Sequence, residues 1–296
     1  MLEKSILKTL TYFDLLDFPL TKDEVFRYLL KTEKDQDPVT TEQVEKVLQE
    51  LVEKGKIDNF DKFYFLPERH EIVQIRNGAE RICQRRLQKA RNFLLLAKFL
   101  PFIRGILVTG SLAGGYSKET SDIDFWVITK KDRIFLGRLF ITGLSQILGI
   151  RRHGNKITDR ICLNYYLTEG SDPIPAYPVC VALDYASMLV ALNPGIETHW
   201  GNIPWIGENL VNPPERAKVW DKAVKRSRII QPILEFIIEF LSAEFWEKKA
   251  ERYQRSRIRE GRGILVSKDH LSFHPGDKWA SFLARFEALT RTNLNP

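Results

Sequence analysis

The most informative stretch of the chain is Val108-Thr-Gly-Ser-Leu-Ala-Gly-Gly-Tyr-Ser-Lys-Glu-Thr-Ser-Asp-Ile-Asp-Phe-Trp-Val127. Apolar runs at its two ends predict strands over 105–109 and 122–129. Between the strands stand a Gly-Ser pair, a ten-residue linker and an Asp-x-Asp sequence. A helical pattern over 134–150 and a third strand over 160–168 follow. Residues 105–168 therefore predict a small α/β unit.

The polar residues of this stretch indicate a site for phosphates and a metal ion. Asp122 and Asp124 are two positions apart on a strand, so their carboxylates point to the same face. Paired carboxylates suit a hard cation such as Mg²⁺ or Mn²⁺. Gly110 allows a close approach of the backbone to a phosphate, and the Ser111 hydroxyl and nearby N–H groups are donors. Alone, Gly-Ser is a tight turn and Asp-x-Asp an exposed strand end; their ordered combination favours the functional interpretation.

These residues resemble the signature of the nucleotidyltransferase superfamily, which has the DNA polymerase β-like fold. The resemblance implies that Gly110 and Ser111 hold the nucleotide phosphates. It also implies that Asp122 and Asp124 are catalytic ligands of Mg²⁺ or Mn²⁺, with an NTP as substrate. The expected reaction is transfer of a nucleoside monophosphate from the NTP to an acceptor hydroxyl. The sequence leaves open whether the acceptor is a protein, a small molecule or an RNA.

One position departs from the pattern of that superfamily. Active members carry a third acidic residue on a later strand, and here the polar residue in the middle of the expected strand is Asn164. An amide cannot accept a proton at neutral pH. Asp159 and Glu169 flank the same strand as alternative acids. A nucleotide-binding sensor without catalytic turnover is therefore a second hypothesis.

Residues 1–70 predict three helices followed by a hairpin, the pattern of a winged helix. Capping boxes at Thr21–Glu24 and Thr40–Gln43 mark two helix starts. With the residues that follow, this region resembles a bacterial group of nucleotidyltransferase-domain proteins with an N-terminal winged helix. A DNA-binding regulator is a third hypothesis. It is disfavoured because residues 1–70 hold 11 basic and 15 acidic side chains, a net charge of −4, whereas the whole chain carries +7.

The sequence patterns divide the 296 residues into three parts, of which residues 1–70 are the first. Residues 71–172 form the transferase core with a leading basic helix over 71–100, and residues 173–296 form a helical C-terminal region. The apolar run 229–243 contains Gln231, Glu235 and Glu239, which predicts a core helix rather than a membrane span. The expected fold is thus α/β of the α+β type with a small mixed sheet. Three cysteines without a paired spacing predict buried, reduced thiols in a cytoplasmic protein that has no membrane partner.

Overall fold

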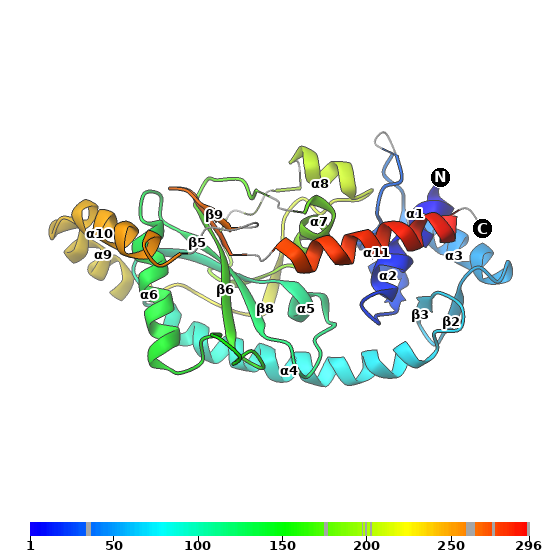
Figure 1. The fold of residues 1–296 in the computed structure, drawn as a ribbon, viewed down its shortest axis with the longest axis horizontal. Coiled ribbons are helices and arrows are strands. Elements are labelled where there is room, and N and C mark those ends of the chain that lie inside the picture. The colour runs from blue at the N-terminus through cyan, green and yellow to red at the C-terminus, as the bar shows by residue number, and fades with distance from the viewer. Residues whose placement is uncertain are drawn as a thin grey trace.

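The computed structural model describes residues 1–33, 37–174, 177–196, 198, 200–201, 203–258, 264–273 and 276–294. Figure 1 shows an elongated molecule with the N-terminal unit at one end and the helices α9 (Ile230–Phe240) and α10 (Ala243–Arg255) at the other. A mixed sheet lies between these ends. The long helix α4 (Glu71–Ala97) runs along one side from the N-terminal unit to the sheet.

The N-terminal unit combines three helices with a small antiparallel sheet of strand order β1-β3-β2. Its elements are α1 (Leu2–Asp14), β1 (Leu20–Thr21), α2 (Lys22–Arg27), α3 (Thr41–Glu53), β2 (Asp58–Phe60) and β3 (Phe63–Phe65). Both predicted capping boxes are confirmed, because the side chains of Thr21 and Thr40 accept from the third helical N–H while Glu24 and Gln43 reach back. The short strand β1 was not predicted, since its two residues carry no periodicity.

Seven strands among the described residues form one mixed sheet of order β8-β7-β4-β5-β6-β10-β9. Their bounds are β4 (Ile103–Val108), β5 (Ile123–Thr129), β6 (Ile161–Thr168), β7 (Leu189–Leu192), β8 (Lys218–Val224), β9 (Ile264–Val266) and β10 (His270–Phe273). The pairs β5–β6 and β7–β8 are parallel, and the other neighbours are antiparallel. The three predicted strands of the core are confirmed within two residues at each end.

The C-terminal region, which the sequence predicted to be mostly helical, contains more strand than expected. Four strands that follow residue 172 join the central sheet. Leu189–Leu192 is a short continuous apolar run, which periodicity cannot assign to a helix or a strand. Lys218–Val224 is an edge strand in which apolar and polar residues alternate little, and it lies within the region that the sequence predicted to be helical.

Helices cover both faces of the sheet. The remaining helices are α5 (Gly110–Gly114), α6 (Ile134–Ile147), α7 (Pro178–Ser187), α8 (Pro204–Asn209) and α11 (Gly276–Leu294). Along β5, Phe125 and Val127 face one core, which contains residues of α4 and α6. Trp126 and Ile128 face the other core, which contains residues of α7, α8 and the N-terminal unit. This alternation places Asp124 on the Trp126 side of the strand.

The N-terminal unit is packed against the rest of the chain. Tyr12 of α1 makes edge-to-face ring contacts with Phe282 and Phe286 of α11. Phe18 packs against Tyr116, which follows α5, with ring centroids 5.4 Å apart. The loop that carries the Gly-Ser sequence is therefore in contact with residues from the start of the chain.

The α9 helix is not the core helix that the sequence predicted. Of its residues, Gln231 is buried, whereas Phe236 and Phe240 are 71% and 80% exposed. The polar side chains of the helix turn toward the protein, and the apolar ones turn outward. Amphipathic periodicity predicts two faces of a helix, and the assumption that the apolar face lies inward fails here.

No helix among the described residues is long and apolar enough to cross a membrane. The three cysteines are free thiols; Cys83 and Cys180 are buried, and Cys162 is half-buried. Burial of the first two agrees with the sequence prediction. Cys162 instead lies beside the polar residues described next.

Candidate active site

A cavity of about 590 Å³ opens where the ends of β4, β5 and β6 meet α7. The predicted residues Gly110, Asp122, Asp124 and Asn164 line it, together with residues that the sequence analysis did not single out. Those further residues come from α6, α7, β10, α11 and the loop before β6. One hollow thus gathers polar groups that are distant in the sequence.

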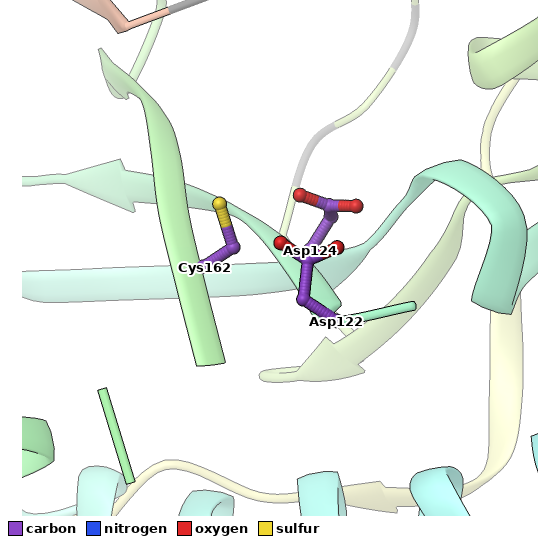
Figure 2. A group of neighbouring side chains, drawn as sticks. All are labelled: Asp122, Asp124 and Cys162. Carbon is purple, nitrogen blue, oxygen red and sulfur yellow. The ribbon is translucent and has the colours of Figure 1, made fainter. Parts of the chain in front are cut away.

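The two predicted carboxylates and one thiol form the centre of this cavity. Ligand atoms of Asp122, Asp124 and Cys162 lie within 4.8 Å of one another (Figure 2). Asp124 on β5 pairs in register with Cys162 on the parallel strand β6, which explains their proximity. Burial, and then the negative charges of Asp124 and Asp122, raise the pKa of the Cys162 thiol well above its usual range. The thiol is therefore neutral near neutral pH.

Asn164 is held against Asp124 by a break in the β5–β6 register. Phe125 pairs with Leu163, but Trp126 pairs with Tyr165, so Asn164 is the extra residue of a bulge. Its Nδ2 donates a 2.7 Å hydrogen bond to Oδ1 of Asp124. Its Oδ1 is buried and has no hydrogen-bond partner among the described residues. This oxygen adds a hard donor beside the two carboxylates, and the set suits a divalent cation such as Mg²⁺ or Mn²⁺.

Gly110 meets a steric requirement of the site. It has a φ of +62°, and a Cβ built on it would lie 3.0 Å from Oδ2 of Asp124. Any other residue would be strained and would press on the carboxylate. Ser111 is placed differently, because its Oγ lies 3.2 Å from Oγ of Ser117. Ser111 does not line the cavity within the described part of the chain.

Asp184 on α7 is a third carboxylate in the cavity, and the sequence analysis missed it. Burial, and then the charge of Asp124, raise the pKa of Asp184 to about 7. No hydrogen-bond donor among the described residues contacts its carboxylate. A signal was present in the sequence, since Asp184 is the sole charged residue of the apolar stretch 179–192.

The alternative acids that flank β6 do not line the cavity. Asp159 binds Nε of Arg86 at 2.7 Å and Nζ of Lys89 at 2.6 Å. Although burial opposes it, these hydrogen bonds lower the pKa of Asp159. Glu169 lies at the other end of β6, where its carboxylate is 3.4 Å from Nε of Arg104. Asp184 is therefore the nearby acid that the structure supplies, from a helix rather than a strand.

Basic side chains line the same cavity: Arg138, Arg151, Arg152 and His153. Nη1 of Arg152 binds Oδ2 of Asp122 at 2.6 Å and lies 3.5 Å from Sγ of Cys162. Nε of Arg138 is buried without a partner among the described residues, and its guanidinium lies 4.6 Å from the ring centroid of Phe273. The cavity thus has one acidic cluster and several cationic groups, which complement a metal ion and an anionic group respectively.

Comparison with known proteins supplies no relative. No family model, no curated protein and no solved structure matches this chain.

Proposed function

We propose that the protein is a metal-dependent nucleotidyltransferase that moves a nucleoside monophosphate from an NTP to an acceptor hydroxyl. The observation that carries this proposal is the composition of one cavity. Asp122 and Asp124 lie within 4.8 Å of each other at their carboxylate oxygens, Asn164 is bonded to the second, and arginines line the same hollow. Nucleotidyl transfer requires acidic side chains that bind a metal cation next to basic side chains that bind the phosphates.

The arrangement of the strands supports a polymerase β-like core. The Gly-Ser pair follows β4, and the Asp-x-Asp sequence opens β5, which is antiparallel to β4 and parallel to β6. The proposed resemblance puts a third acid on a later strand, and the polar residue in the middle of β6 is Asn164. Three helices and a sheet of order β1-β3-β2 likewise support a winged helix over residues 1–70.

Each group has a distinct role in the proposed reaction. The carboxylates of Asp122 and Asp124, with Oδ1 of Asn164, would hold Mg²⁺ or Mn²⁺. A cation held there would supply positive charge that neutralises the phosphates and polarises the phosphorus under attack. Arg138, Arg151 and Arg152 bind the phosphate oxygens, and for this Arg152 leaves Asp122.

Asp184 is the proposed general base. Its raised pKa, about 7, matches that of a group which takes a proton near neutral pH. It accepts the proton of the acceptor hydroxyl as the acceptor oxygen bonds to the α-phosphorus. The bond from that phosphorus to the bridging oxygen breaks, and pyrophosphate leaves. Asp184 thereby supplies the function for which Asn164 is unsuited.

The acceptor class stays open between a protein, a small molecule and an RNA. Duplex DNA is disfavoured, because α3 carries Glu42, Glu45, Glu50 and Glu53 against one lysine, Lys46, with Lys54 directly after the helix. The contacts of the N-terminal unit with α11 and with Tyr116 support a packing role for it. Free thiols support a cytoplasmic location.

A nucleotide sensor is the second candidate, and Asn164 is the observation that favours it. Its amide donates to Asp124 and so adds no negative charge to the cation site. Such a protein would bind Mg²⁺–NTP without releasing pyrophosphate.

Pyrophosphate release from each of the four NTPs, with Mg²⁺ or Mn²⁺ and a cell extract as acceptor pool, tests the proposal. The variant Asp122→Asn/Asp124→Asn should lose about 100-fold or more of the release. Asp132→Asn, at an exposed acid outside the cavity, is the matched control and should retain it. Release that is unchanged in the double variant overturns the proposal. Saturable NTP binding without release, in calorimetry, supports the sensor instead.

A further inference from the structure

Helices α9 and α10 lie at the end of the molecule opposite the N-terminal unit (Figure 1). They and the residues next to them expose many large apolar side chains. We call this set the α9–α10 apolar face. Its members are Ile229, Ile230, Ile233, Leu234, Phe236, Ile237, Phe240, Leu241, Phe245, Trp246 and Tyr253. Monomeric proteins rarely leave so many neighbouring apolar side chains in water, which indicates that another surface covers them.

Polar contacts fix the orientation of this face. Nε2 of Gln231 donates to the carbonyl oxygens of Leu100 and Ile103, both at 2.7 Å. Glu235 binds Arg104 through two bonds of 2.7 and 2.9 Å. One turn further on, Glu239 binds Arg133 and Lys130. Gln231, Glu235 and Glu239 are spaced four residues apart, so they form one side of α9, and this side is bonded to the body of the protein. The helix cannot turn its apolar side inward without breaking these bonds.

The segment that carries the face is basic, because residues 225–258 hold eight Lys and Arg against five Glu. All five acids of residues 225–258 are engaged: Glu235 and Glu239 as above, Glu247 with the N–H groups of Phe135 and Leu136, Glu244 with Lys248, and Glu251 with Arg255. Six basic residues form no ion pair among the described residues: Lys225, Arg226, Arg228, Lys249, Arg252 and Arg257. Nζ of Lys249 lies 4.8 Å from the ring centroid of Phe245 and 5.3 Å from that of Trp246.

We propose that the α9–α10 apolar face docks on an anionic lipid bilayer surface. Ile and Phe side chains would enter the boundary between headgroups and acyl chains, with Trp246 and Tyr253 at headgroup level. The six unpaired cations complement anionic headgroups. A second copy of the chain fits this charge pattern poorly, because its cations would lie next to the cations of the first copy and repel them. The acids that argued against a membrane span in the sequence face the protein, so they do not oppose this surface contact.

Vesicle flotation of the full-length protein tests the proposal. The probes are vesicles of phosphatidylcholine alone and of phosphatidylcholine mixed with phosphatidylserine, each at low and at high salt. The protein should float with the anionic vesicles, and salt should weaken this binding. Phe236→Glu/Phe240→Glu should reduce the partition coefficient about tenfold or more, because two large apolar side chains are lost from the buried face. Lys249→Gln/Arg252→Gln should weaken binding to anionic vesicles alone.

The matched control is Phe60→Glu, which makes the same exchange at a 59% exposed phenylalanine on β2 of the N-terminal unit. It should bind the vesicles as the unchanged protein does. Circular dichroism and a thermal melt establish that each variant is folded. Absence of flotation, or flotation that is equal for both lipid compositions, overturns the proposal. A concentration-dependent dimer in analytical ultracentrifugation that Phe236→Glu/Phe240→Glu abolishes, without vesicle binding, assigns the face to a second copy. None of these outcomes depends on nucleotidyltransferase activity.

Discussion

Nδ2 of Asn164 donates a 2.7 Å hydrogen bond to Oδ1 of Asp124, across a bulge between parallel strands. The bond orients the carboxylate and leaves Oδ1 of Asn164 buried without a partner among the described residues. An acidic residue at position 164 would replace the amide hydrogen-bond donor with a negatively charged carboxylate. We therefore expect the identity of residue 164 to affect both the stability of the protein in EDTA and its response to divalent cations.

Asn164→Asp should destabilise the protein in EDTA and strengthen its response to Mg²⁺ or Mn²⁺. The variant places a further carboxylate against Asp124, and like charges at this distance repel each other. A cation relieves the repulsion, so the melting temperature should rise more steeply with Mg²⁺ in the variant. Differential scanning fluorimetry across a Mg²⁺ titration measures this. Asn164→Leu removes the amide without adding charge and should show a weaker response than either; equal responses in all three proteins would exclude residue 164 from the cation site.

Arg86→Gln should be among the most damaging single substitutions in the core. The Arg86 side chain is fully buried, and its guanidinium binds Asp159 together with the carbonyl oxygens of Lys118 and Glu119. It thereby holds the segment between α5 and β5 that leads into Asp122. Loss of one partner from such a buried network costs about 3–5 kcal/mol.

Urea denaturation measures the free energy of unfolding for this comparison. The matched control is Arg85→Gln on the same helix. Arg85 is exposed and pairs with the exposed Glu119 at 2.8 Å, while its contact with Asp159 is longer, at 3.7 Å. Arg85→Gln should cost much less than Arg86→Gln, because water screens an exposed ion pair. Similar losses for the two variants would mean that Arg86 contributes no more than a surface ion pair.

The parts of the site that the sequence predicted are those that local geometry determines. Asp122 and Asp124 reach one cavity because side chains alternate along a strand, and the carboxylate–Asn164 contact follows from adjacent parallel strands. Asp184 was missed because tertiary packing of α7 brings it there, about sixty residues further along the chain.

The predicted burial of the apolar side of α9 was wrong for a related reason. Its periodicity separates an apolar side from a polar one but does not say which side meets the protein. That choice depends on Arg104, Arg133 and the free carbonyl groups near Leu100, all distant in the sequence. Short strands such as β7 were not predicted, because a run of four apolar residues shows neither helical nor strand periodicity.

Asp184→Asn should stabilise the protein at neutral and higher pH. Burial and the charge of Asp124 raise the pKa of Asp184 from 3.8 to about 7 in the folded protein, so ionisation opposes folding. Below about pH 4 the carboxyl is protonated in both states and the variant gains nothing. The gain grows as pH rises from about 4 to 7 and is complete above that, on the order of 2–4 kcal/mol.

Urea denaturation in EDTA between pH 4 and 8 checks this window for Asp184. Its neighbours do not confuse the result, because the pKa values of Tyr116 and Cys180 are raised away from this range by burial. The same variant should lose pyrophosphate release if Asp184 is the proton acceptor. A pH-independent difference in stability between the two proteins would show that the carboxyl titrates as an ordinary exposed acid.

Gly110→Ala should lose cation affinity as well as stability. The residue has a φ of +62°, which costs an L-residue about 1–2 kcal/mol, and its new Cβ would press on Oδ2 of Asp124. Gly143→Ala supplies the contrast, because Gly143 lies within α6 and a Cβ there meets nothing within 4 Å. That substitution should be neutral or stabilise by about 0.5–1 kcal/mol. Urea denaturation and the Mg²⁺-dependent melting shift separate the two effects, since backbone strain lowers the free energy of unfolding with or without Mg²⁺, whereas displacement of Asp124 reduces the Mg²⁺ response. A Gly110→Ala variant with reduced stability and an unchanged Mg²⁺ response would place Asp124 outside the cation site.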